Sequence, residues 1–231
     1  MTDYKLIAAE ACLQFIKPGQ TIGVGAGSSI SHLIEFISHN KELAESLAFV
    51  SSSFKTRALL QEKGLKLQFS SQINPPIATY FDGCDQFDEG LNALKSGGGI
   101  HTSEKILASM AEEFILVGDD SKMVSKLGHS YPVVLEILPE ALTAVLSRMK
   151  SIYPTASVKL RIADQKDGAV ISDHGNLLAD VLFEELPELA VLNIDLKMIP
   201  GVVEHSLFYR MATKAVVAGA QGIRIVHPEK E

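Results

Sequence analysis

The residues best suited to chemistry are acidic, basic and glycine residues gathered between positions 82 and 104. They are Asp82, Asp85, Lys95, Gly97, Gly98, Gly99 and Glu104. The first two follow an apolar run that we expect to be a buried strand, and open α/β sheets bind ligands at the carboxyl ends of their strands. Proton transfer beside a carbonyl needs a base, a group that stabilises the developing oxyanion and a dry pocket, and this segment supplies the first two.

Each of these residues also has a purely structural interpretation. Asp82 and Asp85 are residue types that form turns, Lys95 is compatible with a solvated surface, and Glu104 suits the first turn of a helix. Taken singly, each residue favours the structural interpretation. Their grouping around three consecutive glycines favours a functional site.

A second glycine-rich segment, GVGAGSS, covers residues 23–29. It does not match the dinucleotide-binding pattern G-x-G-x-x-G, because Ser28 stands where the third glycine belongs, and the next strand ends in serines 51–53 rather than in an acid. Glycine amides, the hydroxyls of Ser28 and Ser29 and a helix N-terminus together predict an anion site. A tight turn in which a serine caps the helix without any ligand is the alternative, and the loop alone does not decide between the two.

The elements around these segments alternate between strand and helix. Alternation of this kind predicts an α/β fold with a doubly wound, mostly parallel, Rossmann-like sheet. The strands expected in this part cover residues 21–24, 47–53, 64–69, 77–83 and 114–120, and the helices cover residues 3–17, 29–39, 54–63 and 102–114, the last with a threonine cap.

The pattern changes after Tyr131 and Pro132. A strand at 132–138, a helix at 139–150 and alternating strands and turns up to 183 predict a smaller α+β, ferredoxin-like module. Segment 188–199 favours a helix, although its β-branched residues would also suit a strand. We expect segments 202–208 and 214–226 to rejoin the first sheet. The predicted domains are therefore a Rossmann-like domain of residues 1–130 plus 203–231 and a smaller inserted domain of residues 131–202.

Composition excludes several classes of function. The 231-residue chain has a formal net charge of -7 and no basic stripe, so no nucleic-acid partner is expected. Cys12 and Cys84 lie far apart, and His101, His174 and His205 lack ligand spacing, so neither a disulfide framework nor a metal site is expected. There is no signal-like start and no apolar run of membrane-spanning length, so we expect a cytoplasmic protein without membrane contact.

The motifs together resemble the type A ribose-5-phosphate isomerases, nearly from end to end of the chain. The motifs that carry the resemblance are GVGAGSS, SSS at 51–53, DGCD at 82–85, K-x-GGG at 95–99 with TSEK at 102–105, DDSK at 119–122, SDHGN at 172–176 and IPGVVEHSLF at 199–208. The resemblance implies that the doubly wound domain is catalytic and that the inserted domain of residues 131–202 serves as a lid or in oligomerisation. It also implies interconversion of ribose 5-phosphate and ribulose 5-phosphate through an enediolate, without metal or organic cofactor.

The resemblance also implies roles for the reacting groups. Glu104 is the expected base that moves a proton between C1 and C2. Asp82 and Asp85 are expected to orient the sugar hydroxyls and to help open the ring. Lys95, with the amides of Gly97 and Gly98, is expected to stabilise the oxyanion.

The same resemblance implies the phosphate end of the site and the assembly. The loop that contains Gly25 and Gly27, with Ser28 and Ser29, is expected to hold the 5-phosphate or the chain near it. Lys5 and Lys122 match basic positions near that phosphate. The partner is then a small sugar phosphate, and a homodimer or tetramer is expected.

Four residues depart from the family pattern: Ala26 replaces a threonine, Cys84 an alanine, Gln86 a glutamate and Ser96 a glycine. Ala26 lacks the threonine hydroxyl that would contact the phosphate, and this loss is expected to cost about 0.5–1.5 kcal/mol of substrate binding. The replacement by Ser96 matters most if the backbone at this position needs a positive φ. These departures keep two alternatives open. One is a diverged sugar-phosphate-binding paralogue that acts as a sensor with weak or no isomerase activity, and the other is an isomerase for a different sugar phosphate.

Overall fold

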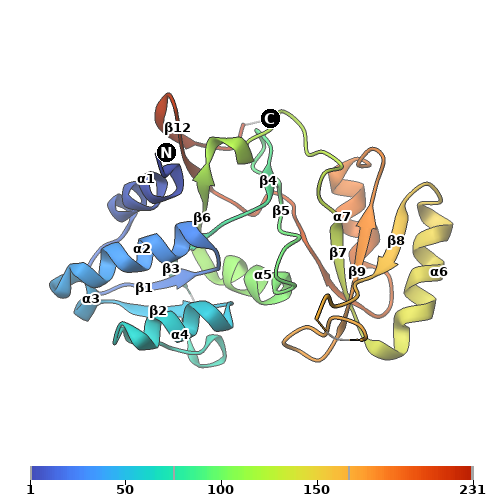
Figure 1. The fold of residues 1–231 in the computed structure, drawn as a ribbon, viewed down its shortest axis with the longest axis horizontal. Helices are drawn as coiled ribbons and strands as arrows, with labels where there is room; N and C mark the ends of the chain where they lie inside the picture. The colour runs from blue at the N-terminus through green and yellow to red at the C-terminus, as the bar shows by residue number, and fades with distance from the viewer. Residues whose placement is uncertain (1, 75, 166, 230–231) are drawn as a thin grey trace.

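The computed structural model describes residues 2–74, 76–165 and 167–229, and Figure 1 shows two sheet-containing parts side by side. The larger part is built on a six-stranded sheet of order β13-β12-β6-β3-β1-β2. All neighbouring strands in it are parallel except β12 and β13, which form an antiparallel hairpin. Its strands are β1 (Thr21–Val24), β2 (Ala48–Ser51), β3 (Ile77–Asp82), β6 (Ala111–Asp119), β12 (Lys214–Gly219) and β13 (Gly222–Val226).

Helices cover both faces of this sheet, and the strands show the period-2 alternation that such packing requires. Phe81 of β3 packs in a core with Ile34 of α2, whereas its neighbour Tyr80 packs in the opposite core with Leu107 of α5. The doubly wound arrangement predicted from the sequence is therefore confirmed. The helices of this part are α1 (Tyr4–Ala11), α2 (Ser28–His39), α3 (Lys41–Ser46), α4 (Phe54–Glu62) and α5 (His101–Met110).

The smaller part is an antiparallel sheet of order β10-β7-β9-β8, covered by two helices. Leu135 of β7, Val145 of α6 and Leu192 of α7 belong to its core and are fully buried. The elements are β7 (Val133–Ile137), α6 (Leu142–Ile152), β8 (Ser157–Leu160), β9 (Leu177–Leu182), α7 (Leu189–Lys197) and β10 (Val202–His205). A second, smaller α+β unit is thus confirmed.

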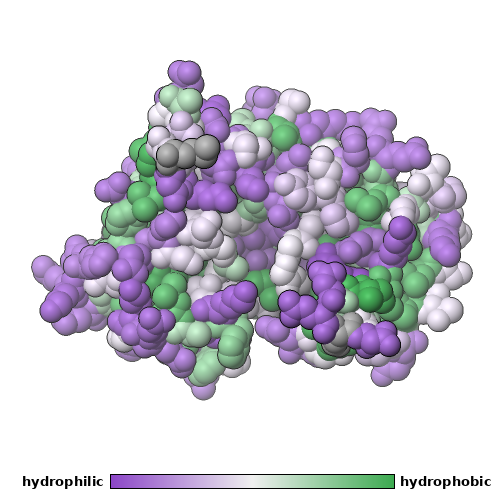
Figure 2. Space-filling view, in the orientation of Figure 1, coloured by the Kyte–Doolittle hydropathy of each residue, from purple (hydrophilic) through white to green (hydrophobic). Residues whose placement is uncertain are grey.

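Short elements complete the structure. A three-stranded sheet combines β4 (Gln86–Phe87), β5 (Ala93–Leu94) and β11 (Leu207–Phe208), and 3₁₀ turns cover Cys12–Phe15, Ser70–Gln72, Asp120–Lys122 and Pro139–Ala141. In the part of the chain that the structure describes, no helix is both long and apolar enough to cross a bilayer. Hydrophilic side chains are spread over much of the face shown in Figure 2, and hydrophobic ones gather in smaller areas.

Three sequence expectations about the elements were wrong. Segment 64–69 is not a strand; it makes one isolated parallel bridge between Leu67 and Phe49, because its backbone leaves the sheet edge after that contact. The helix expected at 102–114 begins at His101, so Thr102 lies inside its first turn and does not cap it. It ends at Met110, since the following residues enter the parallel ladder with β3. Segment 202–208 does not rejoin the large sheet, because β10 pairs with β7 and β11 pairs with β5.

The domain boundaries stay a prediction. Strands β12 and β13 do return to the large sheet, in line with a discontinuous larger domain. Strand β10 spans the predicted boundary between residues 202 and 203 and pairs with the smaller sheet.

Candidate active site

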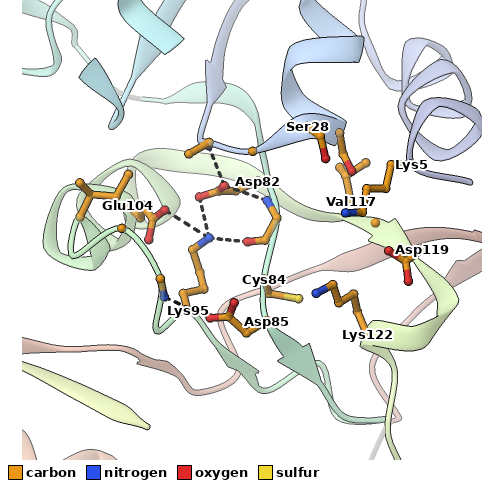
Figure 3. Close-up of a pocket in the computed structure, with 18 residues that line it drawn as sticks. Lys5, Ser28, Asp82, Cys84, Asp85, Lys95, Glu104, Val117, Asp119 and Lys122 are labelled. Carbon is orange, nitrogen blue, oxygen red and sulfur yellow. Dashed lines mark hydrogen bonds and ion pairs between the residues drawn. The ribbon is translucent and has the colours of Figure 1, made fainter. Parts of the chain in front are cut away.

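A cavity of about 260 Å³ opens at the carboxyl ends of the parallel strands, where β1, β3 and β6 stop next to one another. This is the sheet edge at which ligands of open α/β folds bind. Figure 3 shows two groups of side chains around the cavity, Asp82, Lys95 and Glu104 at one end and Lys5, Ser28 and Lys122 at the other. The cavity is lined by Lys5, Ala26, Gly27, Ser28, Ser29, Asp82, Gly83, Cys84, Asp85, Lys95, Gly97, Gly98, Ile100, Glu104, Val117, Gly118, Asp119 and Lys122.

Asp82, the last residue of β3, is held through both carboxylate oxygens. Its Oδ1 accepts the backbone N–H groups of Ala26 at 3.0 Å and Gly83 at 2.8 Å. Its Oδ2 accepts the Tyr80 hydroxyl at 2.6 Å and lies 2.9 Å from Lys95 Nζ. Burial, reinforced by the Asp82 charge, raises the pKa of Tyr80 well above its usual value, so the phenol remains a donor. Asp82 therefore has one fixed orientation at the cavity wall.

Lys95 joins the two carboxylates of this end. Its ammonium also lies 3.3 Å from Glu104 Oε1 and donates to the carbonyl oxygen of Gly83. Burial acts to lower the pKa of Lys95, but the charges of Asp82 and Glu104 outweigh it and raise this pKa above the ordinary value. The residue therefore presents a buried, permanently charged ammonium to the cavity.

Glu104 lies in the first turn of α5 with only 4% of its surface exposed. Its Oε1 contacts Lys95, and its Oε2 is buried without a hydrogen-bond partner among the described residues. Burial is the main cause that raises the pKa of Glu104 to about 8, against the lowering effect of Lys95. A carboxylate with such a pKa and one uncommitted oxygen is suited to take up and return a proton near neutral pH.

Asp85 fixes the glycine loop that borders the same end. Its Oδ2 accepts the backbone N–H groups of Ser96 at 2.5 Å and Gly97 at 3.2 Å. Gly98 and Gly99 adopt φ of 68° and 67°, a conformation that favours glycine, whereas Ser96 is not among the positive-φ residues. The serine departure from the family pattern therefore brings no backbone strain at this position.

The opposite end of the cavity carries the features of an anion site. Gly27, with φ of 98°, precedes the first residue of α2, and Ser28 and Ser29 form the start of that helix. In the described part of the chain no side chain caps this helix. The serine cap expected from the sequence is absent, because Ser28 already lies inside the first turn. The unpaired amides of a first turn, two hydroxyls, Lys5 and Lys122 converge here.

Of the residues to which the resemblance assigns a role, only Gly25 does not line the cavity. A Cβ at this position would lie 1.9 Å from Cγ of Asp82, so the glycine makes room for that carboxylate rather than for a ligand. The other predicted site residues all border the one cavity. Their catalytic and binding roles stay predictions.

Sequence reasoning did not single out Asp119, the last residue of β6, which also lines the cavity. Burial acts to raise the pKa of Asp119, but hydrogen bonds from Ser121 outweigh it and lower this pKa. An acid directly after an apolar strand was the available signal, since that strand ends at the same sheet edge as β3. Among the described residues, no group of three or more His, Cys, Asp or Glu side chains is arranged to hold a metal ion.

Comparison with known proteins agrees with this geometry. Residues 48–222 match the sequence model of the family described as Ribose 5-phosphate isomerase A (phosphoriboisomerase A). Ribose-5-phosphate isomerase A of Thermosynechococcus vestitus is 35% identical over 215 residues, which cover 92% of this chain and 90% of that protein.

Two solved structures extend the likeness to the fold. Ribose 5-phosphate isomerase A from Methanocaldococcus jannaschii superposes with a TM-score of 0.89 at 30% identity and covers 97% of this chain and 98% of that one. A D-ribose-5-phosphate isomerase in complex with phospho-erythronic acid superposes with a TM-score of 0.91 at 31% identity, over 98% of this chain and 100% of that one. The family match and these full-length relatives, together with the cavity, show that the chain belongs to the ribose 5-phosphate isomerase A family.

Proposed function

We propose that the chain interconverts ribose 5-phosphate and ribulose 5-phosphate, with Glu104 as the base. Membership of the isomerase family supports the reaction. The observation that carries the residue assignment is the buried contact of Glu104, Lys95 and Asp82 at one end of a cavity whose other end is an anion site. To bind and react, a five-carbon sugar with a phosphate on C5 needs the reacting groups at one end of the cavity and the anion site at the other.

In the forward direction, the Glu104 carboxylate removes the proton on C2 of the open-chain aldose, and the electron pair forms an enediolate. A proton moves from O2 to O1, the acid form of Glu104 returns its proton to C1, and the ketose results. Oε1 of Glu104 lies 3.3 Å from Lys95 Nζ, and Oε2 makes no hydrogen bond to any described residue. Atoms and charges balance without an oxidant, a reductant or a second substrate. General-base catalysis of this kind contributes roughly 10²–10⁴-fold.

Lys95 and the glycine loop stabilise the negative charge that develops on the sugar oxygens. The Lys95 ammonium is fixed by Asp82 and Glu104, so it needs no reorganisation during the reaction. The amides of Gly97 and Gly98 border the same end, and Asp85 holds their loop in place. Asp82 and Asp85 orient the hydroxyls of the sugar.

The phosphate binds at the start of α2. Helix N-termini attract anions through unpaired N–H groups and the helix dipole. Ser28 and Ser29 add hydroxyl donors there, and Lys5 and Lys122 add positive charge. Local contacts of this kind let a chain with a formal net charge of -7 bind an anionic substrate.

The sensor alternative rests on Ala26, Gln86 and Ser96, none of which is the proposed base. The Oε1 of Gln86 accepts the backbone N–H of Gly128 at 2.8 Å, and Gln86 does not line the cavity. Ala26 keeps its backbone hydrogen bond to Asp82. These contacts favour an active isomerase over a sensor.

The assembly and the location of the protein are also proposals. A homodimer or tetramer is supported by three exposed apolar side chains on one side of α7, Val191, Ile194 and Met198. Light scattering of the purified protein tests this assembly, and a monomeric mass contradicts it. A cytoplasmic location stays a prediction.

The activity is tested by incubating the purified protein with ribose 5-phosphate and measuring ketose formation. Wild type is expected to form ribulose 5-phosphate, and Glu104→Gln is expected to lose about 10³-fold in kcat. Glu10→Gln, an exposed glutamate on α1, is the matched control and keeps wild-type turnover. Tight binding of the sugar phosphate without ketose formation by wild type establishes the sensor instead, and a panel of other aldose phosphates identifies a different preferred substrate.

A further inference from the structure

The first turn of α5 is docked on the small sheet and presents a single side chain to the cavity. Within residues 101–105, only Glu104 lines the cavity. The other four contact the smaller part: His101 Nε2 lies 3.3 Å from the Glu204 carbonyl oxygen, Thr102 donates to Glu136, Ser103 Oγ lies 3.2 Å from His174 Nε2, and Lys105 Nζ lies 2.9 Å from Glu204 Oε1. Helix α5 packs against β3 and β6 on one side and against β10 on the other (Figure 1).

Two of these contacts form a matched pair. Glu136 of β7 and Glu204 of β10 are opposite each other in the antiparallel register, so their side chains leave the same face of the sheet. Thr102 and Lys105 are three residues apart on α5 and therefore lie on the same side of the helix. Two side chains of the helix thus contact two carboxylates of the sheet. Two such contacts fix both the position of the helix and its rotation about its own axis.

Glu136 is a fully buried carboxylate with no lysine or arginine contact among the described residues. Besides Thr102, it accepts hydrogen bonds from Ser172 Oγ at 2.7 Å and Asn176 Nδ2 at 2.8 Å, and it contacts His174 Nδ1 at 3.2 Å. Burial acts to raise the pKa of Glu136, but these hydrogen bonds outweigh it and lower this pKa. A buried charge is costly unless hydrogen bonds replace its lost solvation. For the Glu136 carboxylate, helix α5 and the turn at 172–176 together supply these hydrogen bonds.

His174 links the same carboxylate to Ser103. A carboxylate only accepts hydrogen bonds, so the imidazole Nδ1 must donate to Glu136. Its Nε2 lies within hydrogen-bond distance of the Ser103 hydroxyl, at 3.2 Å. The SDHGN motif, which has no part in the chemistry proposed above, thereby holds the residue next to Glu104.

The helix needs this support because its own start is weakly defined. None of the side chains that the structure describes caps α5, and the loop before it contains Gly98 and Gly99 at positive φ. A carboxylate about 5 Å from a helix axis moves by about 1 Å when the helix rotates by about 10°. A displacement of about 1 Å at a reacting group can cost about 10²-fold in rate.

We propose that Glu136 and Glu204 form a positioning site that holds α5 through Thr102 and Lys105 and so aims Glu104 at the substrate. The inference rests on the proposed function, in which Glu104 is the base. It assigns no chemistry to Glu136, Glu204 or His174. These residues contribute only by orienting the Glu104 carboxylate.

Thr102→Val tests the site because it removes the hydroxyl and keeps the side-chain shape. We expect kcat to fall about tenfold or more while KM stays within about threefold, since the substrate contacts at the other end of the cavity are untouched. Thr102→Ser keeps the hydroxyl and is expected to restore kcat to within about threefold. Thr143→Val is the matched control, because Thr143 is the exposed second residue of α6 just as Thr102 is the second residue of α5. Glu204→Gln tests the second contact and is expected to lower kcat with little change in KM.

A second readout does not depend on turnover. In ¹³C NMR of carboxyl-labelled glutamate, the signal that disappears in Glu104→Gln reports the ionisation of Glu104. Rotation of the helix in Thr102→Val relieves the burial of Glu104, so its pKa is expected to fall from about 8 toward 4.5. Unchanged kcat together with an unchanged Glu104 titration in Thr102→Val overturns the positioning site. Absence of ketose from wild type refutes the proposed function instead, and the NMR titration then still decides whether the site positions Glu104.

Discussion

Replacing the proposed base by glutamine is expected to make the protein more stable while it removes the activity. Glu104 is buried, and its pKa in the folded protein is raised from an ordinary value of 4.5 to about 8, chiefly by that burial. Above pH 4.5 the unfolded chain ionises this residue freely, whereas the folded chain must keep it protonated or bury its charge. The folded state therefore loses stability as the pH rises from 4.5 to about 8, and Glu104→Gln does not.

The magnitude follows from proton linkage. A tenfold change in an ionisation constant is worth about 1.4 kcal/mol. At pH 7 the wild type is then destabilised by about 3 kcal/mol through Glu104, and at pH 9 by about 5 kcal/mol, both upper values because Lys95 and Glu104 titrate together. Near pH 4.5 and below, the difference in stability between wild type and Glu104→Gln becomes small. A gain of about 3 kcal/mol is expected to raise the urea midpoint by about 1 M.

Urea unfolding of wild type and Glu104→Gln at pH 5, 7 and 9 measures this difference. We expect the stability gain of the variant to grow with pH and to level off above pH 8. Glu10→Gln controls for the loss of one exposed helical carboxylate and is expected to change stability by less than about 0.5 kcal/mol at each pH. A variant that is less stable than wild type at pH 9, or a difference that does not depend on pH, refutes the assignment of a raised pKa to Glu104.

Three further perturbations test other parts of the site. The pH profile of kcat/KM is expected to rise through an acid limb near pH 8, because Glu104 must lose its proton before it can act as a base. Lys122→Met is expected to raise KM for ribose 5-phosphate about tenfold or more in a kinetic assay, because it removes one positive charge from the phosphate end of the cavity. Gly25→Ala is expected to abolish turnover and to destabilise the fold by about 1–3 kcal/mol in urea unfolding, because a Cβ there would displace the Asp82 carboxylate.

Each of these expectations can fail. An acid limb near pH 4.5 would show that Glu104 is not shifted or is not the base. An unchanged KM in Lys122→Met would show that the phosphate does not bind near the Lys122 ammonium. The matched control is Lys126→Met, which replaces an exposed lysine that forms an ion pair with Glu185. An active Gly25→Ala protein would mean that Asp82 tolerates displacement or has no part in catalysis.

The fold class was predictable because local patterns dominate it. Strand and helix periodicities alternate through the first half of the chain, and a parallel sheet is the arrangement that such alternation favours. The fate of segment 202–208 was not predictable, because its apolar residues suit any sheet, and the choice between sheets depends on partners far away in the sequence. The end of α5 at Met110 was missed for the same reason, since pairing with β3 overrides helix propensity there.

The residues of the candidate site could be predicted from the sequence, but the hydrogen bonds that hold them in place could not. Carboxylates at strand ends and a lysine before three glycines identify Asp82, Lys95 and Glu104 as neighbours. The hydrogen bond of Thr102 to Glu136 joins residues on separate elements, and no spacing rule connects them. The free oxygen of Glu104 also depends on three-dimensional burial, which no sequence pattern specifies.

The most direct test of the central claim is the fate of the C2 proton in Glu104→Gln. Ribose 5-phosphate labelled with deuterium at C2 is incubated with wild type and with the variant, binding is measured by calorimetry, and loss of the label is followed by NMR. We expect the variant to bind the sugar phosphate within about threefold of wild type and to remove the label at least about 10³-fold more slowly. Loss of the label at the wild-type rate in Glu104→Gln would contradict the assignment of Glu104 as the base.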